Sequence, residues 1–227
     1  MGEARRTRLH AIARAGVVAL CLAFTLQAVT AAAADNVSTP AEGIDYAVIA
    51  GGQPFDPATR GVEVAEVFAY WCPHCAHFRA PLADWAKTLP AGAHLTLVPS
   101  VGREGDAFPA AFFAAQALGA DARSHEAVFA AIHDRQDLPA NASEDELAAF
   151  YAGLGFDPAK FRAALHSPAV VAELERARAF EDRAGIEGVP TLIVAGKYRV
   201  LAPDHDGMLA TARWLVDREL AQHAGGR

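Results

Sequence analysis

The sequence Cys72-Pro73-His74-Cys75 constrains this chain more than any other feature, because it lies between an apolar run and a helix-like stretch. The run from Val62 to Trp71 is rich in β-branched and aromatic residues, which favours a buried strand. Cys72 therefore falls at the predicted start of a helix, where free backbone N–H groups and the helix dipole stabilise a thiolate. Cys75 follows one turn later, close enough to Cys72 to form a disulfide.

The N-terminal segment is predicted to be a secretory signal peptide. Four arginines precede or begin an apolar stretch from Ala15 to about Val29, and small residues offer a cleavage site near Ala34. An uncleaved membrane anchor is the alternative, but it needs roughly 20 apolar residues and this stretch is shorter. Cys21 lies in the apolar stretch, so the mature chain keeps only Cys72 and Cys75. In an exported protein such a pair is oxidised, bound to a metal, or cycling between states.

The mature chain is acidic. Residues 1–34 carry four arginines and one glutamate, so their removal leaves 16 basic and 26 acidic residues of the original 20 and 27. Nucleic-acid binding depends on cationic neutralisation of phosphates, and we therefore expect no nucleic-acid partner. The remaining length of about 190 residues is enough to bury the core of one domain, or of one domain with an insertion.

The hydrophobic pattern divides the mature chain into strands and helices in a defined order. Residues 36–60 are predicted to form an extended arm with at most one edge strand, at Tyr46 to Ala50. Strands are predicted at Val62 to Tyr70, His94 to Pro99, Pro190 to Val194 and Tyr198 to Leu201, the last two joined by a turn at Gly196-Lys197. Helices are predicted at Ala76 to Leu89, interrupted by Pro81, and at Pro109 to Leu118, Ser124 to Asp134, Ser143 to Leu154, Pro158 to Leu165, Pro168 to Ala184 and Gly207 to Gln222.

This order of elements matches an α/β protein with the thioredoxin fold and an all-helical domain inserted in its middle. After a signal peptide at residues 1–34, we expect residues 35–102 to form the first part of the thioredoxin-like domain. Residues 103–185 are expected to form the inserted helical domain, and residues 186–227 the second part of the thioredoxin-like domain. The Phe112-Phe113 pair is predicted to lie in the core.

Two motifs in this chain resemble the signatures of the DsbA family of periplasmic thiol:disulfide oxidoreductases. They are the segment from Phe68 to Cys75 and, far downstream, Gly188-Val189-Pro190-Thr191. The resemblance implies a periplasmic dithiol oxidase of a Gram-negative bacterium that passes its disulfide to folding exported proteins with reduced cysteines, through a mixed disulfide at Cys72. It also implies reoxidation by a quinone-linked membrane oxidase of the DsbB type. We expect no bound cofactor, no metal and a monomer.

Disulfide exchange needs an accessible thiolate and a second thiol that resolves the mixed disulfide. Cys72 is predicted to take the first role and Cys75, buried one turn inward, the second. Pro73 has a φ angle suited to the first helical turn. His74 is predicted to place a cationic donor over the Cys72 sulfur, and a solvated histidine without that role is the alternative.

The resemblance to thioredoxin-like proteins further implies a cis Val189–Pro190 bond. In that geometry Pro190 and the Val189 backbone would face Cys72 and hold an extended substrate by strand-like hydrogen bonds. The alternative is an ordinary proline at the start of a strand.

Glu66 is the one charged residue expected inside the buried strand beneath the active site. There it could relay the Cys75 proton, as the family places an acidic residue at this position. The alternative is a glutamate that reaches solvent, as Glu63 is expected to do. Family members often pair this acid with a lysine on the next strand, and the stretch from His94 to Pro99 contains none.

Two other functions are compatible with the dithiol. A disulfide isomerase or reductase could use the same fold, although isomerases of the DsbC type carry an N-terminal dimerisation domain, for which the residues between Ala34 and Arg60 are too few. A metal-binding module could use Cys72 and Cys75 with His74 or His77. That set lacks the fourth ligand of a structural zinc site.

Overall fold

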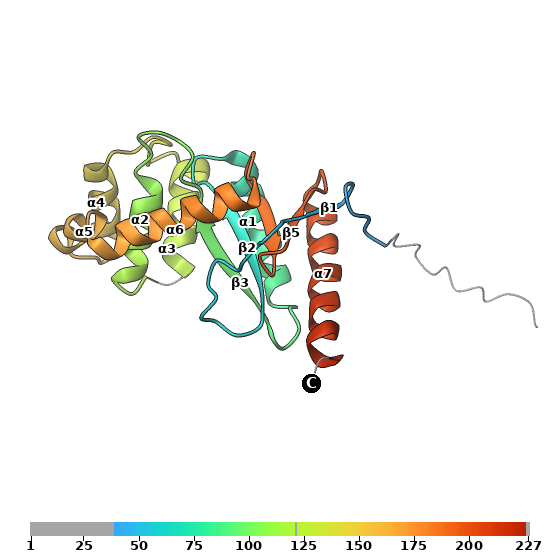
Figure 1. Ribbon diagram of the computed structural model, residues 1–227. Helices are drawn as coiled ribbons and strands as arrows, with labels where there is room; N and C mark the ends of the chain where they lie inside the picture. Colours follow the sequence, from blue (N-terminus) through green and yellow to red (C-terminus); the bar gives the residue numbers. More distant parts are fainter. Residues whose placement is uncertain (1–38, 121, 226–227) are drawn as a thin grey trace, which may run out of the picture. The chain divides into compact units, whose positions relative to one another are not determined.

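One mixed sheet of five strands organises the protein, in the order β1-β5-β4-β2-β3. The computed structural model describes residues 39–120 and 122–225 (Figure 1), so the predicted signal peptide and Cys21 lie outside the described residues. The strands are β1 (Tyr46–Val48), β2 (Val62–Phe68), β3 (Ala93–Pro99), β4 (Thr191–Val194) and β5 (Tyr198–Val200). The central strand β2 runs parallel to β3 and antiparallel to β4, and all seven of its residues are buried. It therefore forms the middle of the core, as its apolar run predicted.

Helices α1 (Pro73–Ala86) and α7 (His205–Gly225) pack together against the sheet. Phe78 and Leu82 of α1 share a buried cluster with Leu215 and Val216 of α7 and with Val64 of β2. Pro81 lies inside α1 without ending it. The helix begins at the residue after Cys72, so the whole dithiol lies at its first turn, as predicted.

The insertion between β3 and β4 is entirely helical within the residues that are described. It consists of α2 (Phe108–Ala117), α3 (Ala122–Phe129), the π-helix η1 (Ala130–Asp134), α4 (Glu144–Gly153), α5 (Pro158–Leu165) and α6 (Pro168–Ala184). These helices lie together beside the sheet, and the long α6 leads back toward it (Figure 1). Ser143 and Glu146 form a capping box, and Asp157 and Ser167 cap helices that begin with proline. The π-helix was not predicted, because periodicity alone does not distinguish one wide turn from an α-helix.

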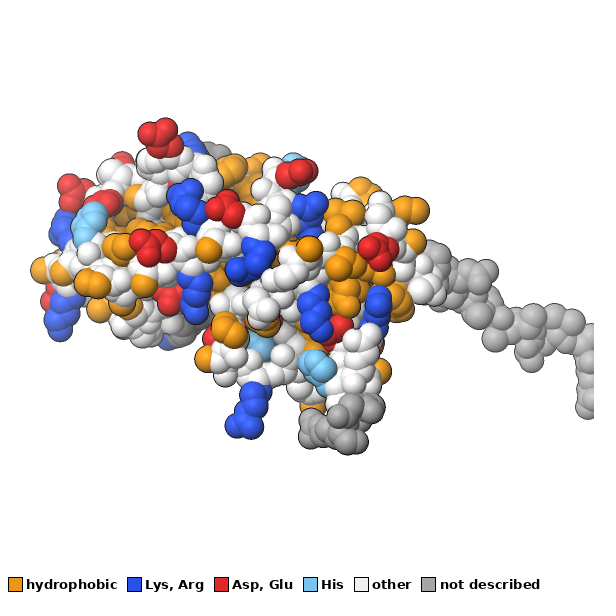
Figure 2. Space-filling view, viewed as in Figure 1, with side chains coloured by type: hydrophobic (Ala, Val, Ile, Leu, Met, Phe, Trp, Pro, Cys, Tyr) orange, Lys and Arg blue, Asp and Glu red, His pale blue; other side chains and the backbone are white. Residues whose placement is uncertain are grey.

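The surface of the insertion carries charges of both signs. Figure 2 shows basic and acidic side chains interspersed over these helices on the face in view. Two ion pairs connect α5 and its C-terminus to α4: Arg162 with Asp145 at 2.9 Å and His166 with Glu144 at 2.8 Å. None of the helices in the described ranges combines the length and the apolar character that a membrane span requires.

Glu63 is buried, and the prediction that it reaches solvent was wrong. Only 1% of the residue is exposed. Its carboxylate accepts hydrogen bonds from the backbone N–H of Phe55 at 2.7 Å, the backbone N–H of Asp56 at 2.9 Å and the hydroxyl of Thr96 at 3.1 Å. The preceding arm supplies two of these donors, and a pairwise contact of that kind cannot be found from strand periodicity.

We predict that Glu63→Ala lowers the free energy of unfolding by about 3 kcal/mol, because the buried N–H of Phe55 and the part-buried N–H of Asp56 lose their acceptor. Glu63→Gln keeps one oxygen acceptor and should lose less. Urea denaturation measures both, with Glu175→Ala on the exposed face of α6 as a control that should change stability by less than about 0.5 kcal/mol. Equal stability of Glu63→Ala and the wild type would show that the carboxylate does not anchor the arm.

Candidate active site

The two cysteines lie at the N-terminus of α1, as predicted. Cys72 is the N-cap residue, Pro73 occupies the first turn, and both thiols are free. The backbone N–H of Cys72 donates to the Ala69 carbonyl at 3.1 Å, which closes a turn just before the helix. Cys75 is fully buried, whereas 5% of Cys72 is exposed, less than we expected of an attacking thiol. Only a small part of Cys72 is therefore open to a substrate.

The two thiols ionise very differently. A hydrogen bond from the Cys75 thiol lowers the pKa of Cys72 to about 6, and the backbone N–H groups of Cys75 and His74 and the positive charge of His74 act in the same direction. Burial opposes this shift. The pKa of Cys75 is raised, first because its proton is held in the hydrogen bond to Cys72 and then because the thiol is buried. At neutral pH the pair thus holds one thiolate, on Cys72, and one proton, on Cys75.

The Val189–Pro190 bond is cis, which confirms the prediction made from the motif. It brings residues 117 positions apart into contact, since the Cys72 sulfur lies 3.4 Å from the Val189 carbonyl oxygen. The protonated thiol can donate to that oxygen. Thr191 donates its hydroxyl to the Gly188 carbonyl at 2.7 Å, which ties this loop to the start of β4.

Glu66 is buried in β2, with 3% of its surface exposed, and lies opposite Leu97 of β3 and Leu192 of β4. Within the described part of the chain its carboxyl group has no hydrogen-bond or ion-pair partner, in agreement with the missing lysine. Burial raises the pKa of Glu66 to about 8, with smaller contributions from the negative charges of Cys72 and Glu126. The carboxyl group is therefore protonated at neutral pH.

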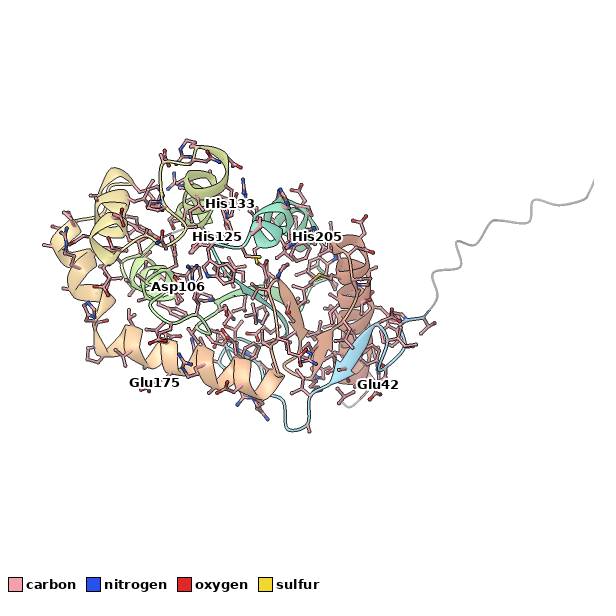
Figure 3. The ribbon with its side chains drawn as sticks, turned by 90° about the horizontal axis from the view of Figure 1, so that it is seen from above. Glu42, Asp106, His125, His133, Glu175 and His205 are labelled. Atoms are coloured by element: carbon pink, nitrogen blue, oxygen red, sulfur yellow. The ribbon has the colours of Figure 1, made fainter. Side chains whose placement is uncertain are left out.

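The insertion contributes contacts to the active-site loop that sequence analysis missed. His133 lies with Nε2 2.7 Å from the Tyr70 carbonyl oxygen, and His125 lies with Nδ1 3.0 Å from the Tyr70 hydroxyl. The Trp71 indole donates its N–H to Asp106 at 2.9 Å. Figure 3 shows the two histidines close together on one helix of the insertion and Asp106 in the loop before α2. No local pattern in the sequence links these residues to the cysteines.

Phe112 and Phe113 are buried in the core, as predicted, with 5% and 4% of their surfaces exposed. Metal-ligating side chains are not gathered in the part of the chain that the structure describes: no three His, Cys, Asp or Glu residues there lie close enough to hold an ion.

Comparison with known families and proteins agrees with this geometry. The model of the DSBA-like thioredoxin domain family matches residues 92–212. The thiol:disulfide interchange protein DsbA of Pseudomonas aeruginosa is 32% identical over 195 residues, which cover 84% of this chain and 90% of that protein. The protein of the same description from Azotobacter vinelandii is 34% identical over 70% of this chain and 75% of its own length.

Solved structures give the same result. The crystal structure of the oxidoreductase DsbA from Xylella fastidiosa superposes with a TM-score of 0.77 and 41% sequence identity, covering 81% of this chain and 99% of that one. The crystal structure of Pseudomonas aeruginosa DsbA has a TM-score of 0.73 and 30% identity, covering 84% of this chain and 98% of its own. The thioredoxin-like fold with inserted helices is therefore shared with these proteins.

We predict that reduced protein titrates one thiol with a midpoint near pH 6, as followed by thiolate absorbance. In Cys75→Ala the midpoint should rise, because the largest stabilising hydrogen bond to the Cys72 thiolate is lost. In Cys72→Ala the remaining thiol should ionise only above the range of free cysteine, about pH 8.5. A wild-type midpoint near 8.5 would contradict the assignment of the thiolate to Cys72.

His125 and, in the reduced protein, the Cys72 thiol make stability rise with pH, and they do so equally in wild type and in Glu66→Gln. Against that common background we predict that Glu66 lowers wild-type stability as pH rises from about 4.5 to about 8. In this window Glu66 is protonated in the folded protein and ionised in the unfolded chain, so the folded state binds one proton more and each pH unit costs about 1.4 kcal/mol. Glu66→Gln should remove this slope and be more stable than wild type at pH 8, by on the order of 4 kcal/mol. Urea unfolding at several pH values tests this, with the exposed Glu187→Gln as control. Parallel pH profiles for wild type and Glu66→Gln would mean that Glu66 ionises normally.

Proposed function

The chain belongs to the DsbA family of thiol:disulfide interchange proteins, and from that premise we propose that its Cys72–Cys75 disulfide is donated to exported proteins that fold with reduced cysteines. Like its relatives, the protein is a disulfide oxidoreductase. The direction of transfer rests on the position of Cys72 at the start of α1, where the Cys75 thiol and then the backbone N–H groups of the first turn lower the pKa of Cys72 to about 6. The thiolate exists only in the reduced form, so whatever stabilises it makes the disulfide easier to give away.

The proposed reaction consists of two exchanges. A substrate thiolate attacks the Cys72 sulfur, a substrate–Cys72 disulfide forms, and the Cys72–Cys75 bond breaks with its electron pair on Cys75, which takes up a proton. A second substrate thiolate then attacks the substrate sulfur of the mixed disulfide and releases the Cys72 thiolate. The substrate dithiol is oxidised to a disulfide, and the enzyme disulfide is reduced to a dithiol. Cys72 is a good leaving group in the second exchange because a thiol of low pKa leaves faster.

Stabilisation of the Cys72 thiolate has a direct effect on redox potential. Each tenfold gain in the equilibrium favouring the reduced form corresponds to about 1.4 kcal/mol, or about 30 mV in a two-electron couple. Hydrogen bonds to the sulfur from the first helical turn, which Pro73 begins, and the positive charge of His74 therefore raise the oxidising power of the disulfide. We propose these roles for Pro73 and His74.

Glu66 is proposed as the proton donor to Cys75 when that sulfur leaves Cys72. A carboxyl group with a pKa of about 8 holds its proton at neutral pH and can release it to a nascent thiolate. Burial disfavours an unprotonated Cys75, so rapid protonation prevents its return attack on the mixed disulfide.

The cis-proline loop is proposed to bind the substrate chain. Val189 places its carbonyl 3.4 Å from the Cys72 sulfur, and Pro190 directly precedes β4. An extended substrate segment that pairs with the Val189 backbone would bring its own cysteine against Cys72.

We further propose that the protein acts as a monomer in the periplasm of a Gram-negative bacterium, after cleavage of residues 1–34. There a quinone-linked membrane oxidase of the DsbB type would reoxidise it, and it would need no cofactor or metal of its own. Residues 103–185 are proposed as the inserted domain. A reductase or isomerase on the same fold remains the second candidate, because the same dithiol geometry serves either direction of exchange.

We predict that the mature protein oxidises a reduced, unfolded substrate at catalytic rates, that Cys72→Ala abolishes this activity, and that Cys75→Ala accumulates mixed disulfides with the substrate. Non-reducing gels and a thiol assay measure these outcomes. Equilibration with glutathione buffers decides the direction of exchange. A potential close to the −270 mV typical of thioredoxin would identify a reductase and overturn the proposed donor role.

A further inference from the structure

We propose that His133 is a positioning residue for the thiol chemistry, because it holds the Tyr70 carbonyl and with it the segment that ends at Cys72. The inference rests on the proposed role of Cys72 as the exchanging sulfur. His133 belongs to the inserted helices and acts on the cysteines through its contact with Tyr70.

The contact is a directional hydrogen bond. His133 Nε2 lies 2.7 Å from the Tyr70 carbonyl oxygen. A carbonyl can only accept, so Nε2 must carry the proton. Tyr70 lies inside the turn in which the Cys72 N–H donates to the Ala69 carbonyl at 3.1 Å, and α1 begins immediately after that turn. The bond therefore anchors the chain two residues before the reactive sulfur.

The same helix also holds the other end of Tyr70. The Tyr70 hydroxyl lies 3.0 Å from His125 Nδ1, and 2% of the residue is exposed. The Tyr70 ring lies 4.9 Å from that of Phe129 and 5.1 Å from that of Phe68, measured between centroids. Tyr70 is thus held by its hydroxyl, its ring and its carbonyl.

The π-helix η1 explains how two histidines eight residues apart reach one tyrosine. In a regular α-helix, a residue eight positions on is rotated by about 80° around the axis, onto a different face. The wider turn of η1, which contains His133, takes up part of that rotation. His125 then reaches the Tyr70 hydroxyl and His133 the Tyr70 carbonyl oxygen. Figure 3 shows the two histidines near each other. Wide turns of this kind occur frequently at functional sites.

Further contacts join the α3–η1 segment to α1 at a point that follows the cysteines in the sequence. Arg79 of α1 binds Asp134 at 2.7 Å and Glu126 at 3.2 Å. The α3–η1 segment is therefore attached to the chain on both sides of the Cys72–Cys75 pair. Attachment on both sides fixes the position of Cys72 relative to the N–H groups of the first helical turn. That position matters because the hydrogen bonds from these groups to the sulfur weaken steeply when their angle changes.

His133→Ala removes the donor and should let the segment before Cys72 move. We expect the Cys72 pKa to rise by about half a unit or more and the equilibrium constant with glutathione to shift about threefold or more toward the oxidised protein. His133→Gln places an amide N–H near the position of Nε2 and should restore both values. His166→Ala is the matched control, since His166 is an exposed histidine of the same insertion that pairs with Glu144.

The outcomes separate this inference from the proposed function. A wild-type Cys72 that ionises like free cysteine contradicts the proposed function. A wild-type Cys72 of low pKa that is unchanged in His133→Ala, even if the variant is less stable, overturns the positioning role alone, as does failure of His133→Gln to restore the values. Should His133→Ala not fold, nitrogen NMR of wild-type His133 still tests the contact. An Nδ1–H tautomer with an unprotonated Nε2 would contradict it.

Discussion

The chemistry of this protein depends on the hydrogen bonds that reach the Cys72 sulfur from the first turn of α1 and from the Cys75 thiol. Almost the whole of Cys72 is buried, and burial by itself would favour the neutral thiol. The donors outweigh that effect, so negative charge is stable on this sulfur. Cys75 keeps its proton at neutral pH because that proton is held in the hydrogen bond to Cys72 and because the thiol is buried, and Glu66 keeps its proton because it is buried. Of Cys72, Cys75 and Glu66, only Cys72 carries a charge at neutral pH. The two thiols therefore differ in reactivity.

Two glutamates of β2 illustrate how partners decide the state of a buried carboxyl group. Glu63 and Glu66 are three residues apart and therefore lie on opposite faces of the strand. Glu63 accepts three hydrogen bonds, from the arm and from Thr96, which replace the water it loses. Glu66 receives none within the described residues and has a raised pKa. One acid therefore stabilises the fold, while the other is suited to hold and release a proton.

The inserted helices take part in building the active site. Trp71 binds Asp106, Tyr70 binds His125 and His133, and Arg79 binds Asp134 across the junction. All these contacts fall on the segments directly before and after the cysteines. The cis-proline loop approaches the sulfur by way of Val189. The positions of the reacting atoms are consequently set by chain segments more than 30 residues away in sequence.

Local sequence was sufficient to predict the thioredoxin-like order of elements, the dithiol at a helix start and the burial of Glu66, while the cis proline was predicted from the resemblance to thioredoxin-like proteins. These predictions depend on hydrophobic periodicity, on short motifs or on an uninterrupted apolar run. Such patterns can be recognised from residues that are close together in the sequence. Only the tertiary structure decided that Glu63 is enclosed by the arm, that η1 widens the helix turn, and that His133 holds Tyr70. These contacts join residues with no regular spacing, because a single polar group finds its partner through the packing of whole elements.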